Sequence, residues 1–364
     1  MKIICVVSAR PNFMKIAPLI EAFKAQTDVR PLLLHTGQHY DDNMSGVFFR
    51  ELGLPEPDFF LGSSGTGVAP IAEMIVKLED VFLKQHPDGI VVPGDVNGAF
   101  ASAFVASRLG IKIAHVEAGL RSFDRSMPEE INRILVDHIS DLLFCTEDDA
   151  ARNLYNEGIP EDRVVFAGNV MIDSLLKNLS LAEKSTILDD LNLTPKRYAV
   201  ATLHRPALVD DPERLAEVFG ALEEIAKEIP ILWPVHPRTK KNLDAFGLQE
   251  RLRNASGLRA TEPLGYLELL KLNANAFCVL TDSGGIQEET TVLRTPCITI
   301  RENTERPCTC KIGSNQLAGL SAQGVLDAWR RVTKENYAGR DVPPLWDGHA
   351  AERIAKIIIQ RWKP

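Results

Sequence analysis

The chain has 364 residues, of which 45% are hydrophobic and 25% are charged, and its formal net charge is −8. This length and balance are typical of a globular protein with two domains of ordinary size. The acidic charge argues against nucleic acid as a partner, because phosphate backbones are bound by clustered Lys and Arg.

The N-terminal segment MKIICVVSAR is a short apolar run that ends at Arg10 without a cleavage-like site, and no other apolar stretch reaches membrane-spanning length. We therefore expect a cytoplasmic protein with no membrane partner. The six cysteines lack regular spacing and fit reduced thiols. Cys308 and Cys310 form a C-x-C pair, but no second Cys/His pair stands near it at finger spacing, so no metal site is predicted.

Apolar runs typical of strands alternate with helix-like stretches along the first half of the chain. Each run is followed by a turn with Gly, Asp or Pro, and this alternation predicts a parallel, doubly wound sheet. The strands expected here are 3–8, 32–35, 90–93, 113–116, 142–145 and 164–167.

The same pattern restarts after Thr194-Pro195, which predicts a second α/β domain. We expect an N-terminal domain at 1–170 and a second domain at 171–348. Apolar residues recur at helical spacing in 349–364, which predicts a last helix with one apolar face. Pro343-Pro344 before it suggests a stiff crossing, and we expect this helix to pack back onto the first domain. The strands expected in the second domain are 198–203, 231–235, 277–280 and 297–300.

Two basic residues follow the first expected strand. Arg10 lies in its turn, and Lys15 is expected in the first turn of the next helix. A cation there opposes the helix dipole at a cost of a few tenths of a kcal/mol, roughly, which suggests that Arg10 and Lys15 share an anion. The alternative is a pair of solvated surface charges.

Three carboxylates are candidates for acid/base chemistry. Asp95 and Glu117 follow neighbouring expected strands, and two carboxylates at one sheet edge push their pKa values up or apart. The alternative is a pair of turn-capping acids. The pattern Ser126-x-x-Glu129, with Pro128 at the first helical position, is typical of a capping box at the start of a helix. From the residues alone we therefore predict that Glu129 caps this helix.

Strand ends in the second half carry groups that suit an anion. His204 and Arg205 follow the strand at 198–203 and can neutralise a diphosphate and protonate a leaving phosphate oxygen. His236 follows the next strand in a similar position, and Arg306 stands among mixed charges after the last one.

The segment 282–289 predicts a strand-to-helix turn that binds an anion. Backbone N–H groups, the helix dipole and two glycines without side chains make a site sized for a phosphate or diphosphate at Ser283, Gly284 and Gly285. Glu289, one helical turn inside, can accept from a sugar hydroxyl. The alternative is an ordinary turn with a glycine pair.

Motifs for the common cofactors are absent from the sequence. There is no Walker lysine loop, no GxGxxG after the first strand, no GxSxG and no HExxH. We therefore expect no nicotinamide, no ATP and no catalytic metal.

Taken in order, these motifs resemble those of the non-hydrolysing UDP-N-acetylglucosamine 2-epimerases. The resemblance runs from the first strand to about residue 319. It implies two Rossmann-like doubly wound parallel-sheet domains facing across a cleft, the GT-B arrangement, with no cofactor and frequent homodimers. The motifs are SARPNFMK (8–15), HTGQH (35–39), GD (94–95), HVEAGLRS (115–122), MPEEINR (127–133), HRP (204–206), DSGGIQEE (282–289) and TERP (304–307).

The resemblance implies roles for the candidate residues. The family eliminates UDP to give 2-acetamidoglucal and adds UDP back after protonation on the other face. Asp95, Glu117 and Glu129 would then be acid/base carboxylates, and His204 would assist departure of the diphosphate. The implied substrate contacts are Arg10 and Lys15 to the diphosphate, Ser283 and Gly284 to phosphate, and Glu289 to the ribose, with Arg205, His236, Gly285 and Arg306 nearby.

Some positions depart from the family pattern. Val96 to Phe100 lacks the usual hydroxyl residues, and Ala207-Leu208 replaces a polar pair. The stretch at 67–71 lacks the polar residues of members that their own substrate activates, although Gln38 and His236 match that second site. Three hypotheses follow: epimerisation of UDP-N-acetylglucosamine, the same chemistry on a modified sugar such as a diacetamido uronate, and UDP-sugar binding without turnover.

Overall fold

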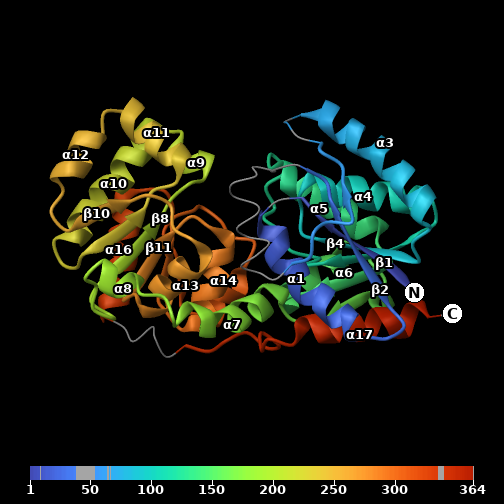
Figure 1. Ribbon diagram of the computed structural model, residues 1–364. Helices are drawn as coiled ribbons and strands as arrows, with labels where there is room; N and C mark the ends of the chain where they lie inside the picture. The colour runs from blue at the N-terminus through green and yellow to red at the C-terminus, as the bar shows by residue number, and fades with distance from the viewer. Residues whose placement is uncertain (9, 38–53, 64, 66, 335–339, 364) are drawn as a thin grey trace. The chain divides into compact units, whose positions relative to one another are not determined.

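The computed structural model describes residues 1–8, 10–37, 54–63, 65, 67–334 and 340–363, and for Arg10 and Pro11 the backbone alone. The chain divides into two compact units, Met1–Leu176 with Pro344–Pro364, and Lys177–Pro343. Each unit is a parallel sheet with helices on both faces (Figure 1). The predicted fold class of two doubly wound parallel-sheet α/β domains is therefore confirmed, and the facing of the sheets across a cleft stays a prediction.

The sheet of the first unit has seven described strands in the order β3-β2-β1-β4-β5-β6-β7, all paired in parallel. Its central strands are continuous apolar runs, as expected for strands covered on both faces. The strands are β1 (Lys2–Val7), β2 (Arg30–His35), β3 (Phe59–Phe60), β4 (Gly89–Pro93), β5 (Lys112–Val116), β6 (Leu142–Cys145) and β7 (Val164–Phe166).

Helices cover both faces of this sheet (Figure 1). On one face α4 packs between α3 and α5, over a core that includes Ile4, Leu34 and Val92. On the other, α1 packs against α17. The helices are α1 (Arg10–Lys24), α3 (Val68–Gln85), α4 (Asn97–Arg108), α5 (Pro128–Ile139), α6 (Asp148–Asn156), η1 (Glu161–Arg163), α7 (Val170–Ala182) and α17 (Ala350–Trp362).

The last helix belongs to the first unit because specific contacts hold both of its ends. Asp173 accepts from the backbone N–H groups of Ala350 and Ala351, at 3.2 and 2.7 Å, and so caps the start of α17. Trp362 lies directly over Gly89, where a Cβ atom would come within 2.2 Å of the indole ring. A residue larger than glycine at position 89 would therefore displace the end of α17.

The sheet of the second unit has six described strands in the order β10-β9-β8-β11-β12-β13, also parallel. The strands are β8 (Ala199–Thr202), β9 (Ile231–Pro234), β10 (Leu258–Thr261), β11 (Cys278–Thr281), β12 (Cys297–Thr299) and β13 (Asn315–Leu317). The helices are α8 (Ile187–Asp190), α9 (Pro206–Val209), α10 (Pro212–Ala226), α11 (Pro237–Ala245), α12 (Gln249–Asn254), α13 (Tyr266–Asn275), α14 (Gly284–Leu293), α15 (Pro307–Lys311) and α16 (Ala322–Lys334).

The core of the second unit explains one departure from the family pattern. Leu208 is buried with Trp233 and Phe219 under α10 and α16, whereas its neighbour Ala207 is exposed. The apolar residue at position 208 therefore serves packing. Across the described residues of both units, no helix is long and apolar enough to cross a membrane.

Candidate active site

The strand order reverses at one place in each sheet, between β1 and β4 and between β8 and β11. Loops that leave neighbouring strands in opposite directions open a crevice at such a point, where α/β proteins bind ligands. Candidate residues follow β4 and β5 in the first unit and β8 and β11 in the second. The sequence therefore places its chemical groups at or beside both reversal points.

Lys15 and Glu117 form a buried ion pair in the first unit. Gly94 lies against this pair, because a Cβ atom there would come within 3.1 Å of Lys15 Nζ and 3.5 Å of Glu117 Oε2. The expected position of Lys15 in the first helical turn is wrong, since α1 begins at Arg10 and Lys15 falls in the second turn. The partner of Lys15 is thus the Glu117 carboxylate. The helix dipole does not explain the position of the Lys15 charge.

Glu117 has a left-handed backbone, with φ +70°. This conformation costs a non-glycine residue on the order of 1 kcal/mol, so it persists only where the surroundings enforce it. The N–H groups of Glu117 and Ala118 both donate to Phe144 O on the neighbouring strand, at 3.1 and 3.0 Å. The backbone is strained at the residue expected to act as acid or base.

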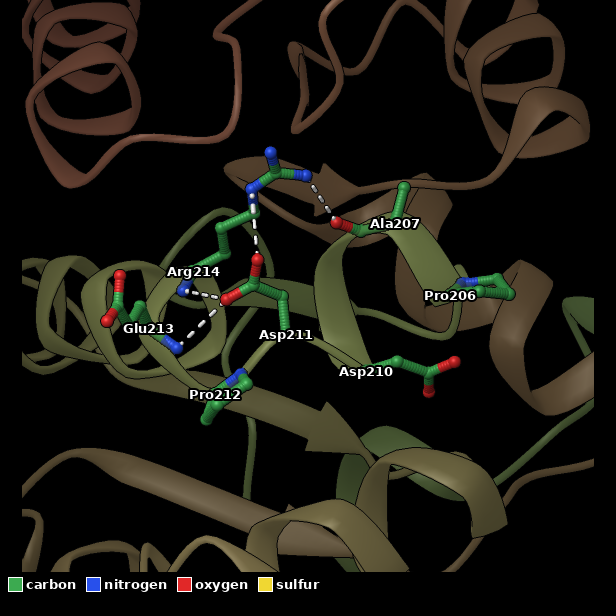
Figure 2. Close-up of a pocket in the computed structure, with 7 residues that line it drawn as sticks. All are labelled: Pro206, Ala207, Asp210, Asp211, Pro212, Glu213 and Arg214. Carbon is green, nitrogen blue, oxygen red and sulfur yellow. Dashed lines mark hydrogen bonds and ion pairs between the residues drawn. The ribbon is translucent and has the colours of Figure 1, made fainter. Parts of the chain in front are cut away.

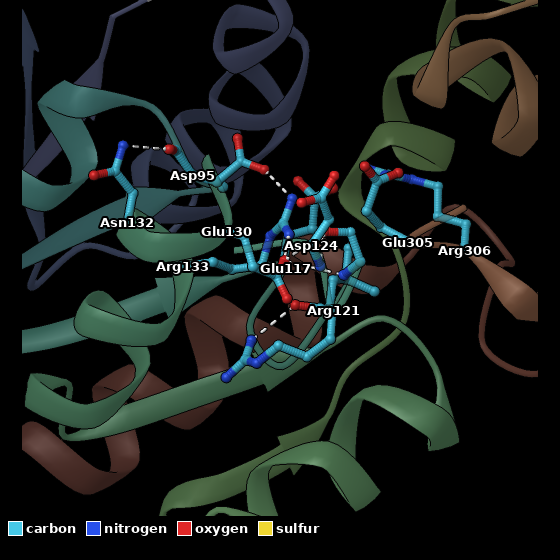
Figure 3. Close-up of polar contacts among 12 residues, drawn as sticks. Asp95, Glu117, Arg121, Asp124, Glu130, Asn132, Arg133, Glu305 and Arg306 are labelled. Carbon is cyan, nitrogen blue, oxygen red and sulfur yellow. Dashed lines mark hydrogen bonds and ion pairs between the residues drawn. The ribbon is translucent and has the colours of Figure 1, made fainter. Parts of the chain in front are cut away.

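Asp95 is held from α5 (Figure 3). Its carboxylate contacts the Arg133 guanidinium, and its carbonyl accepts from Asn132 Nδ2 at 2.9 Å. Arg133 also contacts the buried Glu130, which accepts from Ser122 and Phe123. Asp95 is therefore a positioned, partly exposed carboxylate.

Glu129 is exposed at the second position of α5. The predicted capping box is wrong, because the N-cap is Met127 and no side chain caps the helix. The Ser126 hydroxyl donates instead to Asp124 Oδ1, at 2.6 Å. Pro128 occupies the first helical position as predicted, and the carboxylate of Glu129 does not serve as a cap.

Asp282 organises the turn after β8, a role that the sequence did not suggest. Its Oδ2 accepts from the backbone N–H groups of His204 and Arg205, both at 2.7 Å, and its Oδ1 lies 2.8 Å from His204 Nδ1. Asp282 is fully buried, whereas the His204 side chain is 40% exposed. Asp282 therefore fixes the backbone of His204 and lies against Nδ1, while part of the ring stays accessible.

Two arginines meet at the start of α14. A Cβ atom on Gly284 would lie 3.3 Å from Arg306 Nη1 and 3.8 Å from Arg205 Nη2. Gly284 is the first residue of the helix, after the N-cap Ser283, so its N–H lacks a partner within the helix. Helix dipole, open backbone and two guanidinium groups together favour an anion at this point.

The charges around this point are balanced by buried acids. Arg306 Nε lies 2.7 Å from Glu288 Oε1, and Arg301 donates two bonds to Glu305. Burial tends to raise the pKa of Glu305, but the arginines, above all Arg301, lower it well below its usual range. Burial and the neighbouring guanidinium groups lower the pKa of Arg205, so an anion bound beside it would stabilise its charge.

Glu289 lies in α14 and is almost fully buried. Burial raises its pKa from 4.5 to about 7; the hydroxyl of Tyr266 opposes this rise, and the charge of Glu288 adds to it. Near neutral pH this carboxyl is close to the midpoint of its titration. It can therefore both donate to and accept from a ligand hydroxyl.

The structure describes some of the remaining candidate residues. The His236 ring lies 5.6 Å from the His204 ring, centroid to centroid, and its Nδ1 accepts from Arg238 N. A surface pocket follows His204-Arg205 along the chain, and Figure 2 shows Arg214 and Ala207 on its wall. The side chain of Arg10, as well as Gln38 and His39, lies outside the described residues. No group of three or more His, Cys, Asp or Glu within the described part of the chain is arranged to hold a metal ion.

A sequence model of the family described as UDP-N-acetylglucosamine 2-epimerase matches residues 21–359. The chain belongs to this family. A family member from Methanocaldococcus jannaschii, named UDP-N-acetylglucosamine 2-epimerase, is 42% identical over 98% of this chain and 99% of its own length. A second, from Pseudomonas aeruginosa, is named UDP-2,3-diacetamido-2,3-dideoxy-D-glucuronate 2-epimerase and is 40% identical over 99% of this chain and 100% of its own length.

The family likeness extends to three dimensions. The crystal structure of the M. jannaschii family member in complex with UDP-GlcNAc and UDP superimposes with a TM-score of 0.90 at 42% identity, and covers 99% of this chain and 100% of that chain. The resemblance seen in the motifs is confirmed, and with it the expectation that the protein is an enzyme, an isomerase.

Proposed function

We propose that this protein interconverts UDP-N-acetylglucosamine and UDP-N-acetylmannosamine by inversion at C2 of the sugar, without a cofactor. The observation that carries the proposal is the convergence of Arg205 and Arg306 on Gly284, with His204 fixed beside them by Asp282. This arrangement suits a diphosphate, and the M. jannaschii relative was crystallised with UDP-GlcNAc and UDP.

The chemistry explains why the site needs several acids. The C2 proton is not adjacent to a carbonyl, so its direct removal is unfavourable. In the proposed mechanism a carboxylate takes the C2 proton while the C1–O bond breaks, which gives 2-acetamidoglucal and UDP. A second acid then protonates C2 from the opposite face, and a diphosphate oxygen of UDP attacks C1 to restore the bond.

The residues divide between the two tasks. We assign the proton transfers to Asp95, Glu117 and Glu129, and leave open which of them serves each face. We expect the diphosphate to bind at Gly284, beside His204. The accessible edge of the His204 ring can then stabilise the diphosphate as it departs. In this assignment Lys15 and Arg10 also bind the diphosphate, Ser283 and Gly285 line the helix start, and Glu289 binds the ribose.

A modified UDP-sugar is the second candidate substrate. The relative from P. aeruginosa, at 40% identity, is named for a diacetamido uronate. The segment 96–100 has no hydroxyl side chain, and its one polar side chain is the amide of Asn97. We infer that this change favours a sugar with a different substituent at C3 or C6. A protein that binds UDP-sugars without turnover is the third candidate.

We further propose that the protein acts as a homodimer. Neighbouring helices of the first unit expose apolar side chains that are expected to be covered by a second copy. They are Val76 and Leu83 on α3, Phe104 on α4, and Ile131 and Leu135 on α5. Light scattering is expected to give twice the mass of 40.3 kDa for the wild type and a monomer for Leu135→Asp.

One incubation separates the candidate functions. The protein is mixed with UDP-GlcNAc in D₂O and followed by NMR, and the same is done with the diacetamido uronate. Deuterium at C2 together with UDP-ManNAc supports the first proposal, whereas turnover of the uronate alone selects the second. Binding of either sugar without deuterium incorporation supports the third candidate, a protein that binds UDP-sugars without turnover.

Variants test the assigned acids. Asp95→Asn, Glu117→Gln and Glu129→Gln are each expected to lower turnover by at least about 10²-fold while UDP affinity is kept. Asp148→Asn is the matched control for Glu129, because it removes an exposed acid from the first turn of α6. Wild-type turnover in any of the three would remove that residue from the mechanism.

A further inference from the structure

A buried carboxylate on α5 contacts the loop of Glu117 directly and the loop of Asp95 through one intermediate residue. Asp137 is fully buried, and its Oδ1 lies 2.6 Å from His115 Nδ1. Its Oδ2 accepts from Gly119 N at 3.1 Å and lies 2.7 Å from Arg121 Nη1. A buried charge is tolerated only when it is paired and hydrogen-bonded, and here both oxygens are engaged.

His115 passes this contact on to the loop of Asp95. Its Nε2 lies 2.9 Å from Gly94 O, and a carbonyl can only accept, so Nε2 donates. Burial tends to raise the pKa of Asp137, but His115 and Arg121 lower it on balance. The imidazole therefore faces the Asp137 carboxylate with Nδ1 and donates to the Gly94 loop with Nε2, so His115 links the two.

The other oxygen of Asp137 holds the loop of Glu117. Gly119 has φ +78°, two residues after the left-handed Glu117, so the turn has two residues in this region. The bond from Gly119 N to Asp137 fixes the turn just beyond Glu117. Arg121, which Glu157 holds from its outer side, closes the same loop.

The remaining contacts of α5 show that the helix is a common frame for this edge of the sheet. Arg133 and Asn132 hold Asp95 (Figure 3). Glu130 accepts from the backbone N–H groups of Ser122 and Phe123. Asp137 differs from these residues in where it acts, because it bonds the turn at Gly119, two residues from Glu117, and reaches Gly94, the neighbour of Asp95, through His115.

We propose that Asp137 is a positioning residue that fixes Asp95 and Glu117 relative to each other through His115, Gly119 and Arg121. This inference rests on the proposed function for its activity readout. Removal of the charge loosens both loops without touching the groups that bind the nucleotide. Misplacement of catalytic groups by about 1 Å typically lowers the rate by about 10²-fold.

The test compares Asp137→Asn with Asp141→Asn. Asp141 accepts from Ile113 N at 2.8 Å, so it is a carboxylate bonded to the opposite end of the same strand, β5. We expect Asp137→Asn to lower kcat by about 10²-fold, with KM and the calorimetric affinity for UDP unchanged, and Asp141→Asn to keep the wild-type kcat. A wild-type kcat in Asp137→Asn, or an equal loss in the control, would overturn the proposal.

A spectroscopic measurement on the wild type covers the case in which Asp137→Asn does not fold. Proton–nitrogen NMR of the histidine rings is expected to show a slowly exchanging Nε2–H resonance for His115, because its buried Nε2 donates to Gly94 O. Absence of a protected Nε2–H on His115 would overturn the proposal. This measurement needs no substrate, so it separates a failure of the positioning network from a failure of the proposed function, which would appear as a wild type without turnover.

Discussion

Replacement of Glu289 by glutamine tests whether burial controls the ionisation of this side chain. The pKa of Glu289 is raised from 4.5 to about 7, with burial as the first cause. Each pKa unit corresponds to about 1.4 kcal/mol, so the ionised carboxyl destabilises the folded state by about 3 kcal/mol. Glutamine keeps the shape and cannot ionise, so the substitution removes this cost.

The sign follows from proton binding. Below pH 4.5 the carboxyl is protonated in both the folded and the unfolded state, and it contributes nothing. Between pH 4.5 and 7 the unfolded state loses the proton that the folded state keeps, so the free energy of unfolding falls as pH rises. Above pH 7 the full cost of about 3 kcal/mol is present. Glu289→Gln is therefore expected to match the wild type near pH 4.5 and to exceed its stability at pH 8.

Hydrogen exchange of peptides from β11 and α14 is the suitable assay, because it reports the opening of the second unit by itself. The difference in opening free energy between Glu289→Gln and the wild type is measured at intervals from pH 5 to pH 8. The reasoning is refuted if the difference does not change with pH, or if the wild type is the more stable protein at pH 8.

Two further predictions concern close packing in the first unit. Gly98→Ala places a Cβ atom 1.9 Å from Ser8 Oγ and 2.8 Å from Thr36 Cγ2, and is expected to lower the free energy of unfolding by about 1–3 kcal/mol in urea titrations. Addition of Ser8→Gly should restore only part of this loss, since the contact with Thr36 remains; full restoration would show that the Ser8 hydroxyl alone fills the space. Trp362→Ala is expected to lower the same quantity by about 3–5 kcal/mol, and an unchanged urea midpoint would contradict the docking of α17 on Gly89.

The regular part of the fold could be predicted because buried parallel strands are nearly pure apolar runs. The predicted strand at 142–145 coincides with β6. The strands that the sequence did not reveal are β3, β10 and β13, which lie at the edges of the sheets or are only two or three residues long. β13 reads Asn-Gln-Leu, and no pattern of hydrophobicity distinguishes it from a loop.

The candidate site was predicted where residues follow strands and missed where they act from elsewhere. Lys15 and Glu117 meet although 102 positions separate them, and the sequence did not suggest this pair, because Lys15 was expected to share an anion with Arg10. Asp137 lies in a helix, and an acidic residue in a helix is normally predicted to be exposed to solvent. The one sequence signal was His115 inside a buried strand, because a buried imidazole requires partners.

Docking of α17 onto the first unit also bears on how the protein is synthesised. The first unit consists of 1–176 and 344–364, so its sheet and most of its helices leave the ribosome long before the segment that covers α1. At ordinary translation rates this interval lasts on the order of ten seconds or more. During that time the nascent chain displays the apolar surface that Ile354, Ile358 and Trp362 later cover, which makes this surface the expected point of contact for a chaperone.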